Sequence, residues 1–287
     1  MGAAGGAWGV RQLLEKPDHQ LHSSAAAGSA AAMASFRPGI AYWLTKAVRA
    51  TGTASEITST SVDKQCLYLA LTNETVGLPL TQSVGPGFSM PPSVGYGLPA
   101  FEPLGPEALL LSEDPTALSD ALADVVEDAW DRGFIKQDSM ESDPVTFAGF
   151  GDPLLRLPAL EAAAAAIKHR RHGAQLRVMT NGMVAASEAL DVVQRLKGCG
   201  VKMLTVPLNA ATPPSYAKMM SPPDGVGFQD VVNFVGVAAE NGLSVECTAV
   251  SGVPKQPKST AKKVEKVAMG CGATAFRLRE WVPAAAE

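Results

Sequence analysis

Cysteines are few in this sequence, and no two of them are close together. The four are Cys66, Cys199, Cys247 and Cys271. Closely spaced cysteine pairs mark structural zinc sites, and dense cysteine frameworks mark small disulfide-bonded domains. The spacing here argues against both and indicates reduced, buried thiols. We therefore expect a reducing compartment, with the cytoplasm favoured over an organelle.

Long apolar runs and strong net charge are also lacking. A membrane-spanning helix needs roughly 20 consecutive apolar residues, and no run in the sequence approaches that length. Charged residues make up 18% of the chain, and the formal net charge is -4. A mildly acidic chain gives no electrostatic reason to bind nucleic acid. The sequence therefore predicts a globular protein with neither a membrane nor a nucleic-acid partner.

The first 35 residues are rich in Ala, Gly and Ser. Such a segment buries too little side-chain surface to offset the entropy lost on ordering. We expect residues 1–35 to be a disordered tail, followed by a helical or linker extension over residues 36–65. A targeting peptide is the alternative, but Glu15 and Asp18 weaken a transit-peptide reading because transit peptides are poor in acids.

From residue 66 onward, short apolar segments alternate with stretches of helical periodicity. The strands are predicted at residues 67–71, 145–148, 176–179, 203–208, 245–250 and 274–278. The first helix between them is the best marked, with Asp114 as its N-cap, Pro115 in its first turn and Gly133 after its end. Strand–helix units in series predict a parallel α/β domain over residues 66–283.

An open sheet and a barrel both fit this alternation. No GxGxxG follows the first strand, and no GxxxxGK[ST] occurs anywhere in the sequence. These are the common phosphate-binding fingerprints of open sheets, so their absence favours a barrel.

Polar and glycine-containing turns follow the predicted strands. They are Thr72-Asn73, GFGDP at 149–153, TNG at 180–182, LNA at 208–210, SGVP at 251–254 and REW at 279–281. Each one alone is ordinary: Gly149 and Gly151 suit a tight turn, and Asn209 suits a helix N-cap. In a βα barrel, however, all these ends converge on the face where ligands bind. Their recurrence therefore indicates a ligand site.

Other chemistries find little support in the sequence. Lys202 begins its strand, at the wrong end for a Schiff-base lysine. The four histidines lie in the tail or at the end of a helix, which argues against a His-centred metal or acid–base site. The basic segment KHRRH, residues 168–172, fits a helix C-terminus that complements the helix dipole.

The strand ends resemble the motifs of the radical S-adenosylmethionine (radical SAM) core domain. VTFAGFGDPLLRLPAL resembles its second strand and Gly-Gly-Glu-Pro motif, and LRVMTNGM resembles its third strand. MLTVPLNAATPPSYAKMMSP resembles the fourth strand, and FRLREWVP the last. The resemblance covers about residues 66–283. It implies an incomplete (β/α)6 TIM-like barrel, in agreement with the strand–helix units counted independently.

The resemblance also implies where S-adenosylmethionine would bind. Gly151 and Asp152 would hold the amino group of its methionine part, and Asn209 would contact ribose or carboxylate. The turn that begins at Ser251 would lie near adenine. The full set of cofactor-binding residues expected on this basis is Gly149, Gly151, Asp152, Asn181, Asn209 and Ser251.

The loop after the first strand departs from the family pattern. The family holds a 4Fe-4S cluster with a Cys-x3-Cys-x2-Cys motif at this point, because such clusters need soft thiolate ligands. Counting from Thr72-Asn73, the three places fall near Thr75, Pro79 and Gln82, none of which is a thiolate. We therefore expect no 4Fe-4S cluster, no other metal ligands and no catalytic residue of the usual kind.

Three functions remain open at this point. The main hypothesis is a non-catalytic or altered protein that binds S-adenosylmethionine or a related nucleotide-like small molecule. The second is an active radical SAM enzyme whose cluster is held by other residues or by a partner chain. The third is an interaction scaffold that docks a protein partner on the acidic, Pro-rich loop of residues 74–113.

Overall fold

The computed structural model describes residues 41–47, 50–51, 58–59, 64–79, 82–88, 103–106, 108–109, 113–131, 144–254 and 260–284. All of them belong to one compact unit, Arg37–Glu287. The predicted tail, residues 1–35, lies outside the described residues. Within residues 36–65, where a helical or linker extension was predicted, the structure describes strand β1, Ala41–Ala47.

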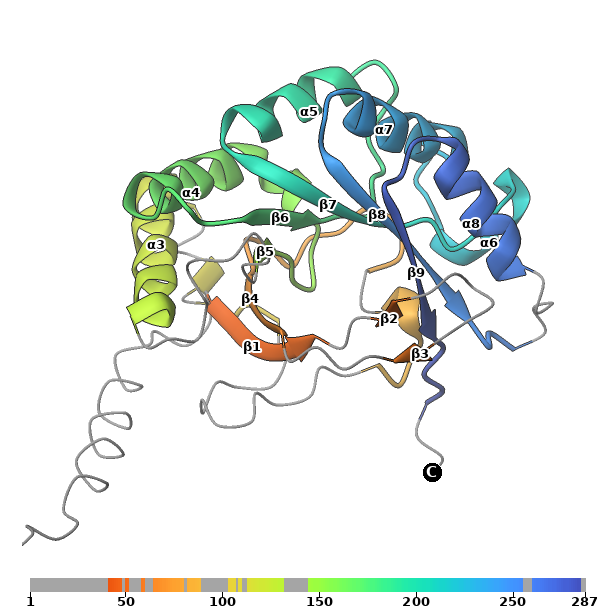
Figure 1. Cartoon of the computed structure of the whole chain (residues 1–287), viewed down its shortest axis with the longest axis horizontal. Coiled ribbons are helices and arrows are strands. Elements are labelled where there is room, and N and C mark those ends of the chain that lie inside the picture. The colour runs from red at the N-terminus through yellow and green to blue at the C-terminus, as the bar shows by residue number, and fades with distance from the viewer. Residues whose placement is uncertain are drawn as a thin grey trace, which may run out of the picture. The chain divides into compact units, whose positions relative to one another are not determined.

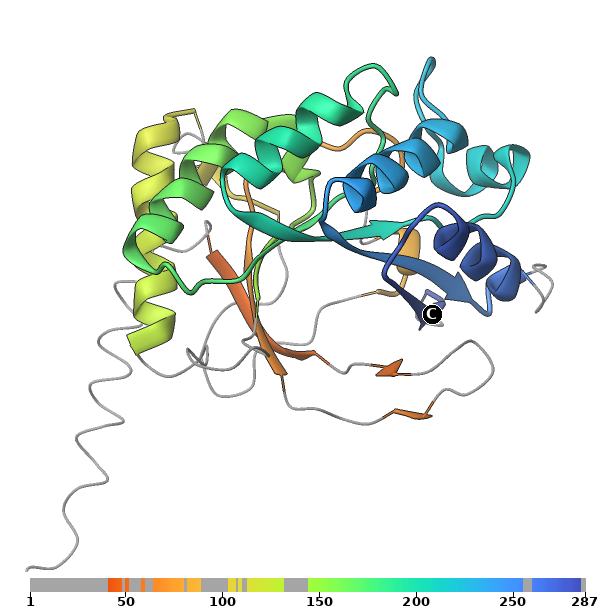
Figure 2. The same ribbon diagram turned by 45° about the horizontal axis from the view of Figure 1, so that its top comes forward.

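A seven-stranded sheet organises the described residues, in the order β1-β4-β5-β6-β7-β8-β9. Its other strands are β4 (Lys64–Leu69), β5 (Val145–Phe147), β6 (Leu176–Met179), β7 (Val201–Pro207), β8 (Ser244–Ser251) and β9 (Ala275–Glu280). Strands β4 to β9 are parallel to their neighbours, and β1 pairs antiparallel with β4. The predicted α/β class with six parallel strands is confirmed. The sheet stays open, with β1 at one edge and β9 at the other (Figure 2).

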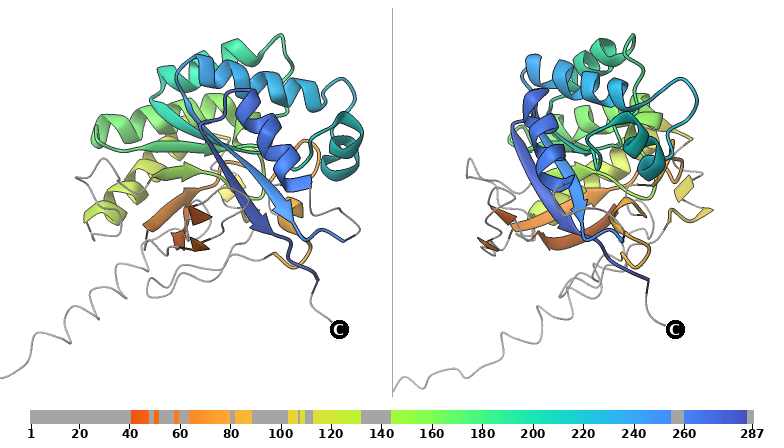
Figure 3. Two further views of the ribbon diagram at one scale, coloured as in Figure 1. Left: turned by 45° about the vertical axis from the view of Figure 1, so that its right-hand side comes forward. Right: turned by 90° about the vertical axis from the view of Figure 1, so that its right-hand side faces the viewer.

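Helices connect the parallel strands and lie along one face of the sheet (Figures 1 and 3). They are α3 (Pro115–Asp131), α4 (Leu157–Arg170), α5 (Ala189–Gly198), α6 (Pro213–Met220), α7 (Phe228–Glu240) and α8 (Thr260–Gly270). Asp114 caps α3 as predicted, since its Oδ1 accepts hydrogen bonds from the backbone N–H of Thr116 at 3.0 Å and of Ala117 at 3.1 Å. Helix α6 was not predicted, although two prolines in its first turn are typical of a helix start. None of the described helices combines the length and apolar character needed to cross a membrane.

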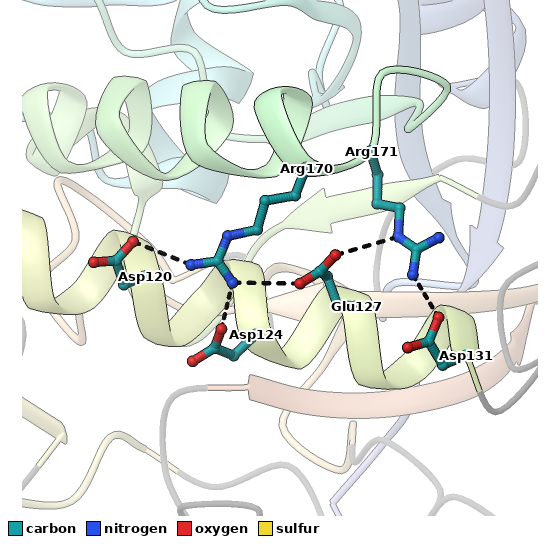
Figure 4. Close-up of polar contacts among 6 residues, drawn as sticks. All are labelled: Asp120, Asp124, Glu127, Asp131, Arg170 and Arg171. Carbon is teal, nitrogen blue, oxygen red and sulfur yellow. Dashed lines mark hydrogen bonds and ion pairs between the residues drawn. The ribbon is translucent and has the colours of Figure 1, made fainter.

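An ion-pair network joins α3 to the end of α4 (Figure 4). Arg170 pairs with Asp120 at 3.2 Å, with Glu127 at 3.5 Å and also with Asp124. Arg171 pairs with Glu127 at 3.6 Å and with Asp131, and its guanidinium lies 5.8 Å from the ring centroid of Trp130. The basic end of α4, interpreted from sequence as a complement to the helix dipole, therefore also binds the acidic face of α3.

The two faces of the sheet differ in composition. The helix-facing side is apolar and buried, with Val178, Leu204, Val206, Val245 and Cys247 at most 1% exposed. Alternation along a strand turns the intervening side chains to the opposite face, which we call the inner face. On β7 and β8 these include Thr205 and Thr248, both buried. The core therefore lies between sheet and helices, whereas the inner face carries polar groups.

Candidate ligand site at the carboxyl ends of the strands

The loop that follows β4 packs directly on the turn that follows β5. The backbone N–H of Gly151 donates to the carbonyl of Thr72 at 3.1 Å, and that of Asp152 donates to the carbonyl of Glu74 at 2.8 Å. A Cβ atom on Gly151 would lie 2.4 Å from the Glu74 oxygen and 2.5 Å from the Thr72 oxygen. Real Cβ atoms essentially never approach closer than 3.0 Å. Glycine is therefore needed at this position for the two segments to meet.

Asp152 is a buried carboxyl group whose two oxygens both accept hydrogen bonds from the chain. Its Oδ1 accepts from the backbone N–H of Leu154 at 2.9 Å. Its Oδ2 accepts from the Thr180 hydroxyl at 2.8 Å and from the backbone N–H of Asn181 at 2.8 Å. Burial raises the pKa of Asp152, and these hydrogen bonds partly offset the rise. Asp152 thus links the carboxyl ends of β5 and β6.

Two asparagines fasten the loop after β4 at two further points. Asn181 donates its side-chain N–H to the carbonyl of Val76 at 2.5 Å, while its Oδ1 accepts from the backbone of Met183 at 3.0 Å. Asn73 pairs with the backbone of Leu104, donating to its carbonyl at 2.9 Å and accepting from its N–H at 2.8 Å. These asparagine side chains therefore hold the loop in place by hydrogen bonds within the chain.

The far end of the same loop is joined to the segment after β9. Val282 donates its N–H to the carbonyl of Val84 at 3.1 Å and accepts at 3.1 Å from the N–H of Gly87. A Cβ on Gly87 would lie 1.9 Å from the carbonyl oxygen of Pro283. The glycines of this Gly-Pro-Gly turn therefore allow close backbone contact with the C-terminal segment.

No thiol occupies the described parts of this loop. Cys199 follows α5 and Cys271 follows α8, so both precede strands and lie at the amino ends of the sheet. Cys247 is inside β8 on the helix-facing side, and burial raises its pKa to about 12. Across the ranges that the structure describes, no three His, Cys, Asp or Glu residues are grouped to hold a metal ion.

A shallow recess with a volume of about 10 Å³, apart from its open mouth, lies on the inner face at these strand ends. It is lined by Ser83, Val84, Met179, Thr205, Pro207, Asn209, Thr248, Val250 and Arg279. Asn209 is only 2% exposed, and its backbone adopts the left-handed conformation at φ 52°, which asparagine tolerates better than most residues. Its Nδ2 lies 3.2 Å from the Met220 sulfur, and its Oδ1 has no hydrogen-bond partner. A residue that lines the recess thus carries a buried side-chain oxygen without a partner.

The predicted site residues fall into separate groups. Gly151, Asp152 and Asn181 gather around the loop after β4, and Asn209 lines the recess. Gly149 packs on the start of the same loop, where a Cβ would lie 2.8 Å from the Cβ of Ala70 and 3.9 Å from the carbonyl oxygen of Thr72. The Ser251 hydroxyl donates to the carbonyl of Arg279 at 3.2 Å and does not line the recess.

Sequence reasoning missed several residues of this region. Thr205 and Thr248 were not predicted and line the recess from inside β7 and β8, whereas Arg279, predicted in the REW turn after the last strand, lines it from inside β9. The signal was a polar side chain at alternate positions of otherwise apolar strands. Tyr216 was also missed: its hydroxyl is buried without a hydrogen-bond partner, and burial, followed by the charge of Asp152, raises its pKa.

The comparison with protein families gives one match, to the model described as "Radical SAM superfamily", over residues 124–268. The match covers about half of the chain and begins after the loop that follows β4. No curated protein matches the chain.

Several solved structures are similar to the chain. The radical S-adenosylmethionine methyltransferase TsrM of Kitasatospora setae is 15% identical, with a TM-score of 0.41, and the match covers 56% of this chain and 28% of that protein. SuiB of Streptococcus suis, bound to S-adenosylmethionine, is 13% identical with a TM-score of 0.44, and the match covers 57% of this chain and 34% of that protein. Methylornithine synthase (PylB) is 12% identical with a TM-score of 0.48, and the match covers 76% of this chain and 53% of that protein. The chain thus spans about a third of the length of the first two. On the family match over residues 124–268, this chain belongs to the radical SAM superfamily.

Proposed function

We propose that this chain binds S-adenosylmethionine, or a related nucleotide, at the recess beside Asn209, and that it does so without a 4Fe-4S cluster. The observation that carries the proposal is the unpaired, buried Oδ1 of Asn209 at a polar recess on the strand ends. A buried polar atom without a partner costs about 1–3 kcal/mol, so a ligand N–H or O–H that paired with it would recover that energy.

The composition of the recess supports a polar ligand. Thr205, Thr248 and Ser83 place buried hydroxyl groups around it, and Val250 and Met179 supply apolar contacts. Small-molecule sites commonly combine an apolar lining with a few polar groups. With about 10 Å³ of space, the recess holds one small polar group of a ligand, and the rest of a nucleoside would lie outside it.

The residues of the loop after β4 do not fit a 4Fe-4S cluster. Such a cluster needs several thiolates close together, and Thr75, Pro79 and Gln82 offer none. The loop is instead fastened by Asn73, Asn181 and its own backbone. The proposed role of this chain is therefore ligand binding without radical chemistry.

Calorimetry with S-adenosylmethionine on the intact chain tests the proposal. Asn209→Gly removes the side chain and keeps the left-handed backbone available, so it separates binding from backbone strain. We expect saturable binding to the wild-type chain and a loss of about tenfold or more in Asn209→Gly, because one hydrogen bond to a buried group is worth about 1–3 kcal/mol.

Asn241→Ala is the matched control, since Asn241 lies at the end of α7 and its side-chain N–H donates to the carbonyl of Val237 at 2.7 Å. It should bind like the wild-type chain. Absence of binding at millimolar S-adenosylmethionine would sink the proposal, as would an equal loss in both variants.

A further inference from the structure

The inner face of the sheet carries an unusual number of ionisable groups. Strand register places Tyr68, Thr146, Arg177 and Met203 in one row across β4, β5, β6 and β7. The next rows toward the carboxyl ends contain Thr205 beside Glu246, Thr248 beside Arg277, and Val250 beside Arg279. Parallel barrels usually fill this space with branched apolar residues. Polar rows at these positions instead indicate a space that receives a polar ligand.

Positive charge exceeds negative charge on the described part of this face. Strands β5 to β9 place three arginines on this face, Arg177, Arg277 and Arg279, but only one carboxylate, Glu246. Glu246 pairs with Arg277 at 2.9 Å and accepts a 3.4 Å hydrogen bond from Thr205. Arg177 instead lies 3.6 Å from the Met203 sulfur. Two of the three guanidinium groups therefore have no carboxylate partner within the described residues.

Unused hydrogen-bond donors accompany this charge. The Nε–H groups of Arg177, Arg277 and Arg279 are buried and have no acceptor among the described residues. Arginine presents its donors in a planar fork that matches the oxygens of phosphate or carboxylate groups. The inner face is thus rich in oriented donors and short of acceptors.

Arg279 is the arginine that lines the recess, together with Asn209, Thr205 and Thr248. Burial, followed by the nearby positive charge of Arg277, lowers the pKa of Arg279 to about 10. Tyr68 and Glu246 act in the opposite direction but do not cancel the effect. A bound anion would relieve this repulsion and would take up the unused donors.

We propose that the inner face binds the oxyanion group of a small molecule, a phosphate or a carboxylate, with Arg279 as its main contact and Arg277 beside it. The hydroxyl groups of Thr205 and Thr248 line the same recess and can complete the donor set. The inference goes beyond the nucleotide proposal, because it concerns the charge of the ligand and holds for anions that contain no nucleoside.

Titration of the intact chain with inorganic phosphate and, separately, with acetate tests this site by calorimetry at low ionic strength. At roughly 0.1 M salt, charges more than about 10 Å apart are largely screened from one another, so low salt keeps the signal large. We expect saturable binding of at least one anion, and the preferred one identifies the oxyanion class. Arg279→Gln should weaken that binding at least about tenfold, as expected for loss of a charge-assisted contact.

Lys263→Gln is the matched control, because it removes one positive charge from the exposed surface of α8. It should leave anion binding unchanged. Absence of saturable binding for both anions overturns the proposal, and so does an equal effect of the two substitutions. Since phosphate and acetate lack a nucleoside, these outcomes are independent of whether S-adenosylmethionine binds.

A second measurement on the wild-type chain covers the case in which Arg279→Gln does not fold. Phenylglyoxal modifies accessible arginines, and mass spectrometry locates the modified residues. Saturating phosphate or acetate should slow the modification of Arg279 several-fold and leave Arg195, on the outer helix α5, unaffected. Equal modification of Arg279 with and without anion would overturn the proposal.

Discussion

Gly151→Ala tests whether the strand-end turns pack on one another without help from a ligand. The added methyl carbon would lie 2.4 Å from the Glu74 oxygen, 2.5 Å from the Thr72 oxygen and 2.7 Å from the Glu74 nitrogen. All three are backbone atoms, so no side-chain rotation relieves the overlap. The loop after β4 must move away from the turn after β5.

The cost follows from that movement. Overpacking of this kind costs about 1–3 kcal/mol. Moving the segments apart also weakens the bonds from Gly151 to Thr72 and from Asp152 to Glu74, each worth about 0.5–1.5 kcal/mol. Alanine also lowers the entropy of the unfolded chain, which stabilises the folded state by about 0.4–1 kcal/mol. The expected net loss in the free energy of unfolding is about 2–4 kcal/mol.

Urea unfolding of the ligand-free chain, followed by far-UV circular dichroism, measures this loss. With an m-value of roughly 2 kcal/mol/M, the midpoint should fall by about 1–2 M while the m-value stays constant. Gly198→Ala is the control, because no atom lies within 4 Å of its Cβ position at the end of α5. That variant should be as stable as the wild-type chain or slightly more stable.

A Gly151→Ala chain as stable as the wild type would refute this reasoning. Such a result would mean that the turn and the loop are separated in solution. The glycine would then leave room for something other than the chain itself.

Two further predictions concern the polar contacts of the fold. Because the pKa of Asp152 is raised in the folded state, its contribution to stability is fully present below the unfolded pKa and is lost as pH rises through the folded pKa. The destabilisation caused by Asp152→Asn, measured by urea unfolding at several pH values, should therefore grow as pH falls; a constant difference would contradict the assignment. Arg170→Ala should lower the free energy of unfolding by about 1 kcal/mol at low salt and by less at about 1 M salt, since its partners are largely exposed. A salt-independent loss would show that packing rather than charge holds α4 to α3.

The sequence was sufficient to predict the parallel α/β architecture because each strand and helix carries its own periodic signal. Residues 176–179 were predicted as a strand and are β6. Residues 203–208 were predicted where β7, Val201–Pro207, begins two residues earlier. The ends of strands are predicted less accurately, because backbone pairing with neighbours, rather than composition, decides where a strand stops. Strand β1 was missed for the same reason: it is held by antiparallel pairing with β4.

The site was only partly predictable. Asn209 was singled out as a polar residue at a strand end, and it lines the recess. The sequence does not reveal that Asp152 accepts hydrogen bonds from the segment of Asn181, or that the Asn181 side chain donates to Val76. Such pairing depends on which strand ends become neighbours. Arg279 was noted only as part of the REW turn, because a charged residue in an edge strand is ordinary unless the register shows which face it occupies.

The central proposal is that this superfamily member binds its ligand at the strand ends without a 4Fe-4S cluster. The most direct test is the iron and acid-labile sulfide content of the full chain, purified and reconstituted under anaerobic conditions. The account predicts a colourless protein with iron and sulfide at background level and no iron–sulfur absorption. Iron and sulfide stoichiometric with the chain, retained after gel filtration and accompanied by a brown chromophore, would contradict it.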